Sequence, residues 1–292
     1  MVIIKLTGGL GNQMFQYAVA SIIAKKNNSC LKIDGDFLKL KEKRPGYTPR
    51  IFELSIFKNN YFEASENEIK QFTHLNLQDR IKKKLHISYP RIYKEKLYLF
   101  DELLFKNKPP IYLMGYFQSY KYFVGKEKLI ENLFSFPVNK LNPKNLDLLI
   151  KIKSSNSVSI HIRRGDYVRD KITNEFHGVC SAEYYKKAIS ILDKRFQNFN
   201  ILFFSDDTDW VKEQFKNIPY NKTFVDYNRG SKSWIDMFLM SNCKHNIIAN
   251  SSFSWWAAWL NKYEEKIVIA PINWFAINNS NWSTTDLCPP EW

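Results

Sequence analysis

Short apolar runs alternate with longer segments of helical spacing at the start of the chain. Residues 2–6 are apolar and β-branched, glycines interrupt the run, and residues 12–26 place apolar side chains every three or four positions. Residues 31–34 form a second short run that is typical of a strand. A strand, a helix and a strand at this spacing are typical of a βαβ unit and predict a parallel sheet.

The periodicity weakens between residues 40 and 110, where charged, aromatic and proline residues are mixed. Segments rich in helix formers predict helices at residues 63–72 and 77–85, and residues 111–115 predict a strand. Prolines, asparagines and lysines then gather over residues 137–156, which read as a helix flanked by connectors.

Beyond this stretch the alternation becomes regular. Apolar runs predict further strands at residues 157–162, 201–204, 247–249 and 266–270, with helical segments at 182–196, 208–215, 234–243 and 253–260. We therefore expect an α/β protein of two Rossmann-like halves, with an N-terminal domain of residues 1–150 and a C-terminal domain of residues 151–292.

The excess of basic over acidic residues indicates which kinds of molecule the protein could bind. The 292 residues contain 43 Lys and Arg against 29 Asp and Glu, a formal charge of +14. Such a balance favours nucleic acid, an acidic membrane surface or phosphate-bearing small molecules, although lysines that only decorate the surface give the same count. The 4 cysteines are far apart and predict neither a disulfide framework nor a zinc site. No apolar stretch approaches ~18 residues and no signal peptide is evident, so a cytoplasmic location is expected.

Polar residues appear at the end of the strand predicted at residues 157–162. Side chains alternate along a strand, so His161 and Arg163 should lie on the face opposite the aliphatic residues. Open α/β sheets bind ligands at the carboxyl ends of their strands. Arg163 could there bind a phosphate through two parallel hydrogen bonds. The alternative is a structural ion pair of Arg163 or Arg164 with Asp166.

Two further strands end in polar groups. Asp206 and Asp207 follow residues 201–204; one is expected to cap the next helix and the other to accept hydrogen bonds from a base or a ribose. Small polar residues open the helix after residues 247–249 and could offer backbone N–H groups to a phosphate, namely Asn250, Ser251, Ser252 and Phe253. A plain N-cap role for Ser252 is compatible with this.

A glycine-rich loop at residues 8–13 separates the first strand from the first helix. It matches neither the GxGxxG pattern nor a P-loop, because the spacing differs and the lysine is missing. Gly9 and Gly11 allow close approach of the backbone to a ligand, and Asn12 and Gln13 bring neutral hydrogen-bonding groups. One such loop is weak evidence, but four polar strand ends together predict a binding site.

At these residues the chain resembles the α-1,2-fucosyltransferases shared by bacteria and animals. The resemblance covers nearly the whole length through five motifs in order: GGLGNQMFQYA at 8–18, GYFQS at 115–119, HIRRGDYV at 161–168, FSDD at 204–207 and ANSSFSWW at 249–256. The third motif is also similar to that of α-1,6- and protein O-fucosyltransferases.

The resemblance implies a GT-B-like fold, with the two Rossmann-like halves facing a cleft and GDP-fucose held mainly by the C-terminal half. The N-terminal half would serve the acceptor, with the loop at residues 8–13 near the donor. Arg163, beside His161, matches the family's phosphate-binding arginine. Asp206 and Asp207 match its guanine- or ribose-contacting motif, and residues 251–253 match its phosphate-contacting turn. The implied activity is galactoside α-1,2-fucosyltransferase, an inverting transfer of L-fucose to the 2-hydroxyl of a terminal galactose.

Inversion requires stabilisation of the departing diphosphate and a base for the acceptor hydroxyl. Arg163 and backbone amides are expected to stabilise the diphosphate, so neither a metal nor another cofactor is expected. The base is expected in the loop after Arg163, with Asp166 preferred over Glu175 and His177.

The partners follow from the same interpretation: GDP-fucose and a galactose-terminated or lipid-linked glycan, with no nucleic acid. Animal members carry a membrane anchor before the catalytic domain; this chain begins at the first strand, so that topology is not expected here. The basic run at residues 80–84 is either a solvated helix face or a peripheral contact with the inner face of a membrane.

Rival interpretations are a transferase for another nucleotide sugar, an RNA-binding protein and a non-catalytic lectin. The basic residues are scattered and no RNA-recognition signature is present, and a lectin would not explain the phosphate-type turns.

Overall fold

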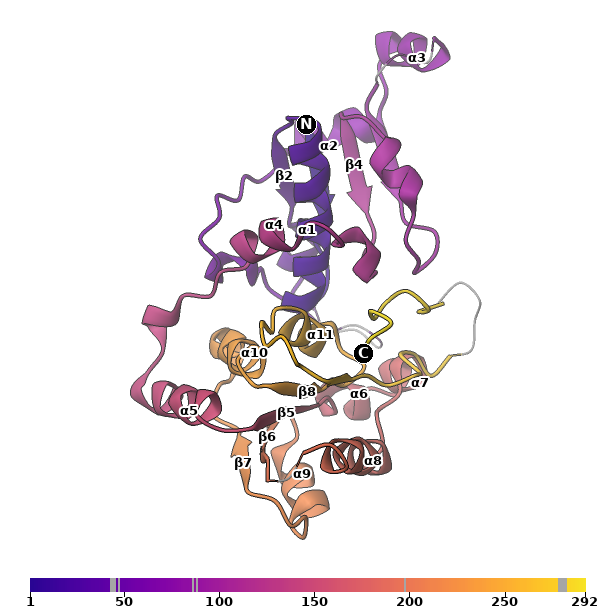
Figure 1. Ribbon diagram of the computed structural model, residues 1–292. Helices are drawn as coiled ribbons and strands as arrows, with labels where there is room; N and C mark the ends of the chain where they lie inside the picture. The colour runs from indigo at the N-terminus through magenta and orange to yellow at the C-terminus, as the bar shows by residue number, and fades with distance from the viewer. Residues whose placement is uncertain (43–45, 47, 86, 88, 197, 278–282) are drawn as a thin grey trace. The chain divides into compact units, whose positions relative to one another are not determined.

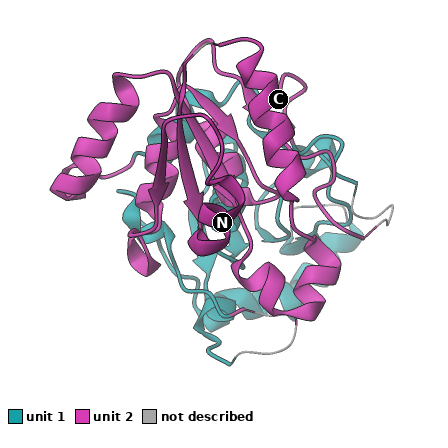
Figure 2. Ribbon diagram, turned by 90° about the horizontal axis from the view of Figure 1, so that it is seen from below, with its two compact units in different colours: residues 1–42, 49–135, 279–287 teal, residues 43–48, 136–278, 288–292 magenta. Residues whose placement is uncertain are grey.

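Two sheets, each with parallel strand pairing throughout, organise the chain. The computed structural model describes residues 1–42, 46, 48–85, 87, 89–196, 198–277 and 283–292. It divides into two units, which Figure 2 colours separately. The first unit comprises residues 1–42, 49–135 and 279–287, and the second unit comprises residues 43–48, 136–278 and 288–292. The predicted α/β class is confirmed, whereas a cleft between the two halves stays a prediction.

The first unit is built on a four-stranded sheet of order β2-β1-β4-β3. Its strands are β1 (Val2–Lys5), β2 (Leu31–Asp34), β3 (Arg91–Lys94) and β4 (Ile111–Met114). Its helices are α1 (Leu10–Lys26), α2 (Glu66–Thr73), α3 (Leu77–Lys84) and α4 (Glu127–Leu133). Helix α1 is buried along almost its whole length, and its buried residues include Gln13, Gln16 and Ser21 beside the apolar side chains.

The second unit contains a five-stranded sheet of order β7-β6-β5-β8-β9. Its strands are β5 (Ser157–Ile162), β6 (Asn200–Ser205), β7 (Lys222–Val225), β8 (His245–Ile247) and β9 (Val268–Ile269). Its helices are α5 (Pro143–Lys153), α6 (Gly165–Arg169), α7 (Lys171–His177), α8 (Ala182–Asp193), α9 (Thr208–Phe215), α10 (Trp234–Ser241) and α11 (Ser252–Trp259). Figure 1 shows α8 and α9 on one side of this sheet and α10 and α11 on the other.

The central strand β5 shows why both faces are covered. Its aliphatic side chains Val158, Ile160 and Ile162 are buried in a core with side chains of α8 and α9. Complete burial of one such side chain contributes about 1.5–3 kcal/mol. On the other face Ser159 is also buried, and its Oγ accepts a hydrogen bond of 2.7 Å from Nδ2 of Asn246. The polar positions of β5 are thus accommodated inside the protein by side-chain partners.

The division of the chain differs from the expected boundary at residue 150. That position lies inside α5, which belongs to the second unit. The side-chain amides of Asn145 in α5 and Asn228 exchange two hydrogen bonds of 3.0 Å, and both residues are buried. These bonds tie α5 to the second unit, so the main division falls between residues 135 and 136.

Among the described residues, no helix is both long enough and apolar enough to cross a bilayer.

Candidate functional site

The three strand ends that the sequence singles out in the second half are neighbours in space. β5 lies between β6 and β8 in the sheet, and all three run parallel. In the register, Ile162 is paired with Ser205, and Ile160 is paired with Ile247. The segments that begin at Arg163, Asp206 and Ile248 therefore leave one edge of the sheet together. In open α/β sheets this carboxyl edge is where ligands bind.

Arg163 lies between two carboxylates at this edge. Its Nη2 donates to Oδ1 of Asp166, and its Nη1 lies 2.6 Å from Oδ2 of Asp206. The guanidinium also lies over the ring of Tyr167, 5.4 Å from the centroid. Burial alone would lower the pKa of Arg163, but Asp206 and Asp166 raise it above its ordinary value. Two carboxylates thus hold the cation at this edge, and the structural ion pair with Asp166 that the sequence left open is present.

Asp206 fixes the turn that follows β5. Its Oδ1 accepts hydrogen bonds from the backbone N–H groups of Arg164, at 2.8 Å, and Gly165, at 2.9 Å. A Cβ at position 165 would lie 2.5 Å from Oδ2 of Asp206, so only glycine fits there. Burial alone would raise the pKa of Asp206, but the Arg163 guanidinium and the two N–H donors lower it. Asp206 is therefore a carboxylate that positions the turn and Arg163 together.

Asp207 has different surroundings. Its Oδ2 accepts a hydrogen bond of 3.0 Å from Nε of Arg164, whose guanidinium lies 4.0 Å from the ring centroid of Trp210. Asp207 precedes α9, yet its side chain forms no capping bond. The expectation that one of the two aspartates caps the following helix is wrong, because Asp206 instead bonds the start of α6. With its side chain 34% exposed, Asp207 is the more accessible of the pair.

His161 is buried at the end of β5. Its ring lies 5.6 Å from that of Phe253, and its Nδ1 has no hydrogen-bond partner among the described residues. Burial lowers the pKa of His161 to about 4, and Arg163 acts in the same direction against Asp206. The imidazole is therefore neutral at pH 7. A buried nitrogen without a partner costs about 1–3 kcal/mol, which a bound group at this edge could recover.

The start of α11 supplies backbone donors. Ser251 is its N-cap, and its Oγ accepts a hydrogen bond of 3.4 Å from the N–H of Phe253. The cap is therefore one residue earlier than Ser252, which is the first residue of the helix. The first turn of a helix leaves backbone N–H groups without intrahelical partners and carries a partial positive charge. This part of the site suits a phosphate.

The side chain of Asn250 forms hydrogen bonds within the protein. Its Nδ2 donates to the backbone carbonyls of His177, at 2.9 Å, and Trp274, at 3.2 Å, and its Oδ1 accepts from Sγ of Cys180. The residue is almost completely buried. Its amide joins the segments before and after α11, so contact with a ligand through this amide would require these bonds to change.

The segment after Arg163, expected as a loop, consists of helices α6 and α7. Asp170 caps α7 by accepting from the N–H of Thr173 at 2.8 Å, and it also accepts from the N–H of Gly46 at 3.1 Å. The expected loop is therefore a helical segment, and α7 is held at its start by Asp170 and at its end by the bond from Asn250 to the carbonyl of His177.

The three candidate bases lie in different surroundings. Asp166 is paired with Arg163. Glu175 lies on an open face of α7, with its side chain 64% exposed and 3.9 Å from Lys171. His177 stacks on Tyr167 at a centroid distance of 4.6 Å, and burial lowers its pKa to about 4. His177 is therefore a neutral, packed imidazole, and Glu175 faces solvent.

The glycine-rich loop belongs to the first unit and is fixed by side-chain amides. Gln13 is fully buried; its Nε2 donates to the carbonyls of Gly8 and Ile51, both at 2.8 Å, and its Oε1 accepts from the N–H of Glu53. Both amide hydrogens and the amide oxygen of Gln13 are thus engaged within the protein. The expectation that Gln13 contacts a ligand does not fit this arrangement, because the side chain instead shapes the loop.

The other loop residues belong to the first turn of α1. Gly9 is the N-cap of α1, Gly11 is buried inside the helix, and Oδ1 of Asn12 accepts a hydrogen bond of 2.8 Å from Gln118. Gly8 has a φ of +75°, a conformation that favours glycine. The roles of Gly9, Gly11 and Asn12 toward a donor stay predictions.

Arg229 lies beside the candidate site at the end of β6 and is not among the residues predicted from the sequence. Its Nη1 donates to the carbonyl of Ser205 and its Nη2 to Oγ1 of Thr208, both at 3.1 Å. It brings a further guanidinium to the end of β6. The available signal was its position just after β7, but that strand was not predicted.

In the described part of the chain, no three His, Cys, Asp or Glu side chains are grouped so that they could hold a metal.

The chain is similar to known glycosyltransferases over its whole length. It is 36% identical over 293 residues to an alpha-1,2-colitosyltransferase of Escherichia coli, covering 100% of this chain and 98% of that protein. It is 38% identical over 297 residues to the O-antigen biosynthesis glycosyltransferase WbnK of Escherichia coli, covering 96% and 97% of the two chains.

Among solved structures, NodZ alpha-1,6-fucosyltransferase of Bradyrhizobium, co-crystallised with GDP, has a TM-score of 0.50 at 13% identity and covers 88% of this chain and 91% of NodZ. That likeness supports the α/β fold. Residues 1–292 of the sequence also match the family model described as glycosyl transferase family 11. The family resemblance that the five motifs indicated is thus confirmed: the chain belongs to glycosyl transferase family 11.

Proposed function

We propose that the protein transfers L-fucose from GDP-fucose to the 2-hydroxyl of a terminal galactose, giving a Fucα1-2Gal product. The observation that carries the proposal is the fixed guanidinium of Arg163 at the sheet edge that also holds the start of α11. Membership of family 11, the α-1,2 linkage in one relative's name and GDP in the NodZ structure support it.

The proposed reaction is a direct displacement. The acceptor oxygen bonds to C1 of fucose while the bond from C1 to the diphosphate oxygen breaks, and GDP leaves with that electron pair. Arg163 has five N–H donors, of which the two carboxylates use only part, so others can bind the diphosphate. The amides at the start of α11 add to this stabilisation, and Asp207 accepts hydrogen bonds from the nucleoside. Asp166 takes the proton of the acceptor hydroxyl.

A second candidate donor is colitose, because one relative of matching length is an α-1,2-colitosyltransferase. Colitose differs from L-fucose in lacking the 3-hydroxyl. The two donors are separated by kcat/KM for GDP-fucose and GDP-colitose with one acceptor. If a protein group forms a hydrogen bond with the 3-hydroxyl of fucose, colitose is the poorer donor, because that buried protein group is then left without a partner.

Incubation with GDP-fucose and either lactose or lacto-N-biose should release GDP and give a product whose NMR spectrum shows fucose α-linked to the galactose 2-oxygen. Excess EDTA should leave the rate unchanged, since arginine and amide groups stabilise the leaving group. A 3-, 4- or 6-linked fucose would contradict the regiochemistry and leave the donor assignment standing. Loss of activity in EDTA that Mn²⁺ or Mg²⁺ restores would contradict the metal-independent step.

We also propose that α3 places the enzyme on an anionic membrane surface, where a lipid-linked acceptor would be found. No residue of α3 is buried, and Figure 1 shows it standing apart from the sheet of its own unit. Leu77, Ile81 and Leu85 recur every four residues and are 73%, 50% and 63% exposed. The same segment carries Arg80 and residues 82–84, all lysines. An apolar stripe beside a basic face is typical of a helix that lies in a membrane interface.

The double variant Leu77→Gln/Ile81→Gln should lower binding to vesicles of phosphatidylglycerol and phosphatidylcholine about 10-fold or more, because it removes most of the apolar stripe. Cosedimentation measures the effect. Ile150→Gln, at a residue of α5 that is 66% exposed, is the matched control and should bind as the wild type does. Equal binding of all three proteins would show that α3 makes no membrane contact.

A further inference from the structure

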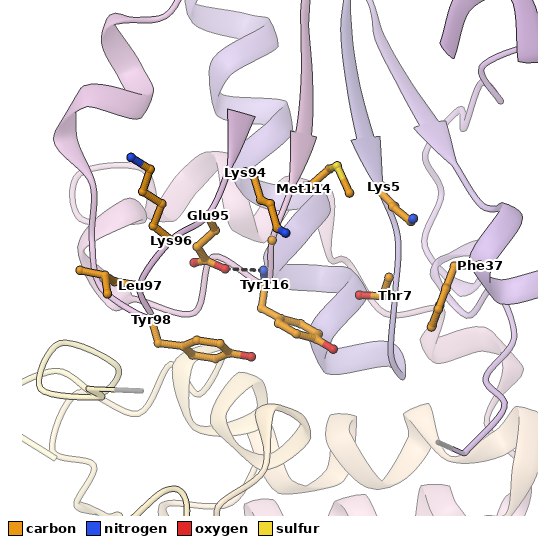
Figure 3. Close-up of a pocket in the computed structure, with 11 residues that line it drawn as sticks. Lys5, Thr7, Phe37, Lys94, Glu95, Lys96, Leu97, Tyr98, Met114 and Tyr116 are labelled. Atoms are coloured by element: carbon orange, nitrogen blue, oxygen red, sulfur yellow. Dashed lines mark hydrogen bonds between the residues drawn. The ribbon is translucent and has the colours of Figure 1, made fainter. Parts of the chain in front are cut away.

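A cavity of about 570 Å³ lies in the first unit at the carboxyl ends of β1, β3 and β4 (Figure 3). This volume is within the range of small-molecule sites, ~300–1,000 Å³. Glu95, Tyr98 and Tyr116 line it together with three lysines. The donor site proposed above uses none of these residues.

Glu95 is a largely buried carboxylate that organises the wall of this cavity. It follows β3, and its oxygens accept hydrogen bonds from the backbone N–H groups of Tyr116, at 2.6 Å, and Phe117, at 3.0 Å. Burial raises the pKa of Glu95 to about 7 against the effect of these donors. The backbone around it is unusual. A Cβ at Gly115 would lie 2.4 Å from Cβ of Glu95, and Phe117 has a φ of +55°.

Such a turn is costly unless the structure around it holds it in place. Here the backbone bends closely around the carboxylate of Glu95, and the same bend places the side chain of Tyr116 in the lining of the cavity. Because the N–H of Tyr116 donates to Glu95, the positions of this carboxylate and of the Tyr116 ring depend on each other. Figure 3 shows the rings of Tyr98 and Tyr116 beside each other below Glu95.

The polar and aromatic groups suit a sugar. A carboxylate has about four lone-pair sites, and the two backbone donors leave others for neighbouring hydroxyls of a pyranose. The rings of Tyr98 and Tyr116, with centroids 5.8 Å apart, offer faces to the C–H surface of a sugar. The lining also brings hydrogen-bond donors to the cavity, namely the ammonium groups of Lys5, Lys94 and Lys96 and the hydroxyls of Thr7 and the two tyrosines.

We propose that this cavity is the acceptor-sugar subsite, in which Glu95 accepts hydrogen bonds from the hydroxyls of a β-galactoside that packs against Tyr98 and Tyr116. The proposal rests on the proposed function, since that function supplies the acceptor class. It adds the location of the subsite and the residues that recognise the sugar.

Tyr98→Leu removes a ring face and should weaken lactose binding 10-fold or more, whereas Tyr98→Phe keeps the face and should stay within about 3-fold of the wild type. Saturation-transfer NMR and titration with lactose measure binding without any transfer. The acceptor KM, measured with GDP-fucose, should rise in parallel for Tyr98→Leu, while slow hydrolysis of GDP-fucose in the absence of acceptor should be unchanged.

Glu95→Gln is the second variant, and Glu102→Gln, at an exposed glutamate, is its control. Glu95→Gln should lose most lactose binding and keep donor hydrolysis, since the amide replaces an acceptor by a donor. Unchanged lactose binding in folded Tyr98→Leu and Glu95→Gln proteins would overturn the subsite. The product assay decides the proposed function separately, because lactose binding does not depend on which sugar is transferred.

Discussion

Replacement of Arg163 by lysine is expected to lower kcat about 10²–10³-fold, nearly as much as replacement by alanine, because a preorganised charge contact with a developing anion is lost. The guanidinium contacts Asp166 through Nη2 and Asp206 through Nη1. A lysine has one ammonium group on a flexible stem and cannot present a planar fork to two carboxylates and a phosphate together. Alanine would in addition leave two partly buried carboxylates without their cation.

Steady-state kinetics with GDP-fucose, combined with thermal melts, would separate chemistry from folding. Arg169→Lys, at an exposed arginine of α6, is the matched control and should keep the wild-type kcat. An Arg163→Lys protein that retains most of the wild-type kcat would disprove the phosphate assignment. Arg164, which is paired with Asp207, would then be the better candidate.

Asp166→Asn should lower kcat about 10²-fold or more, the effect expected when a general base is removed. The asparagine oxygen can still accept from Arg163, so the turn should keep its shape, but it cannot take a proton. The Kd of GDP-fucose, measured by calorimetry, should change little. Asp209→Asn, at an exposed aspartate of α9, should leave both quantities unchanged.

Loss of GDP-fucose binding in Asp166→Asn would instead identify Asp166 as a structural partner of Arg163. The structure then changes the order of the remaining candidates. Glu175 faces solvent on α7, whereas His177 stacks on Tyr167, the ring that also lies below Arg163. His177→Ala would therefore be the next variant to test, before Glu175→Gln.

The sequence predicts the strands whose residues are buried on both sides. β6 is an almost continuous apolar run and β5 alternates Val and Ile with Ser and His, and the structure has both strands close to the expected residues. β3 and β7 were missed because they are short edge strands with half-exposed side chains, so their sequences lack that signal. α6 and α7 were missed because each is only one or two turns long. The start of α6 in addition depends on Asp206, a residue 41 positions away from Gly165.

The gathering of the strand ends at one edge follows from parallel pairing and was predictable. The partners of individual side chains were not. The positions of Gln13 and Asn250 in the sequence predict amides that bind a ligand, yet both side chains form hydrogen bonds within the protein. Asp206 and Asp207 are adjacent and chemically identical, yet one holds the turn after β5 and the other pairs with Arg164. Such choices depend on distances of a few ångströms between segments far apart in sequence.

Short segments of the chain return to the unit that they left, and this limits how chimeras of the protein with a relative could be made. The chain passes from one unit to the other at residues 42–43, 48–49, 135–136, 278–279 and 287–288. A fragment ending at residue 135 would lack Asp286, whose Oδ2 accepts from the N–H of Phe100 at 2.8 Å. A fragment starting at residue 136 would lack Gly46, a partner of the α7 cap. A single crossover between residues 135 and 136 would therefore separate the returning segments from the unit that they complete, and a functional chimera must carry each of these segments with its own unit.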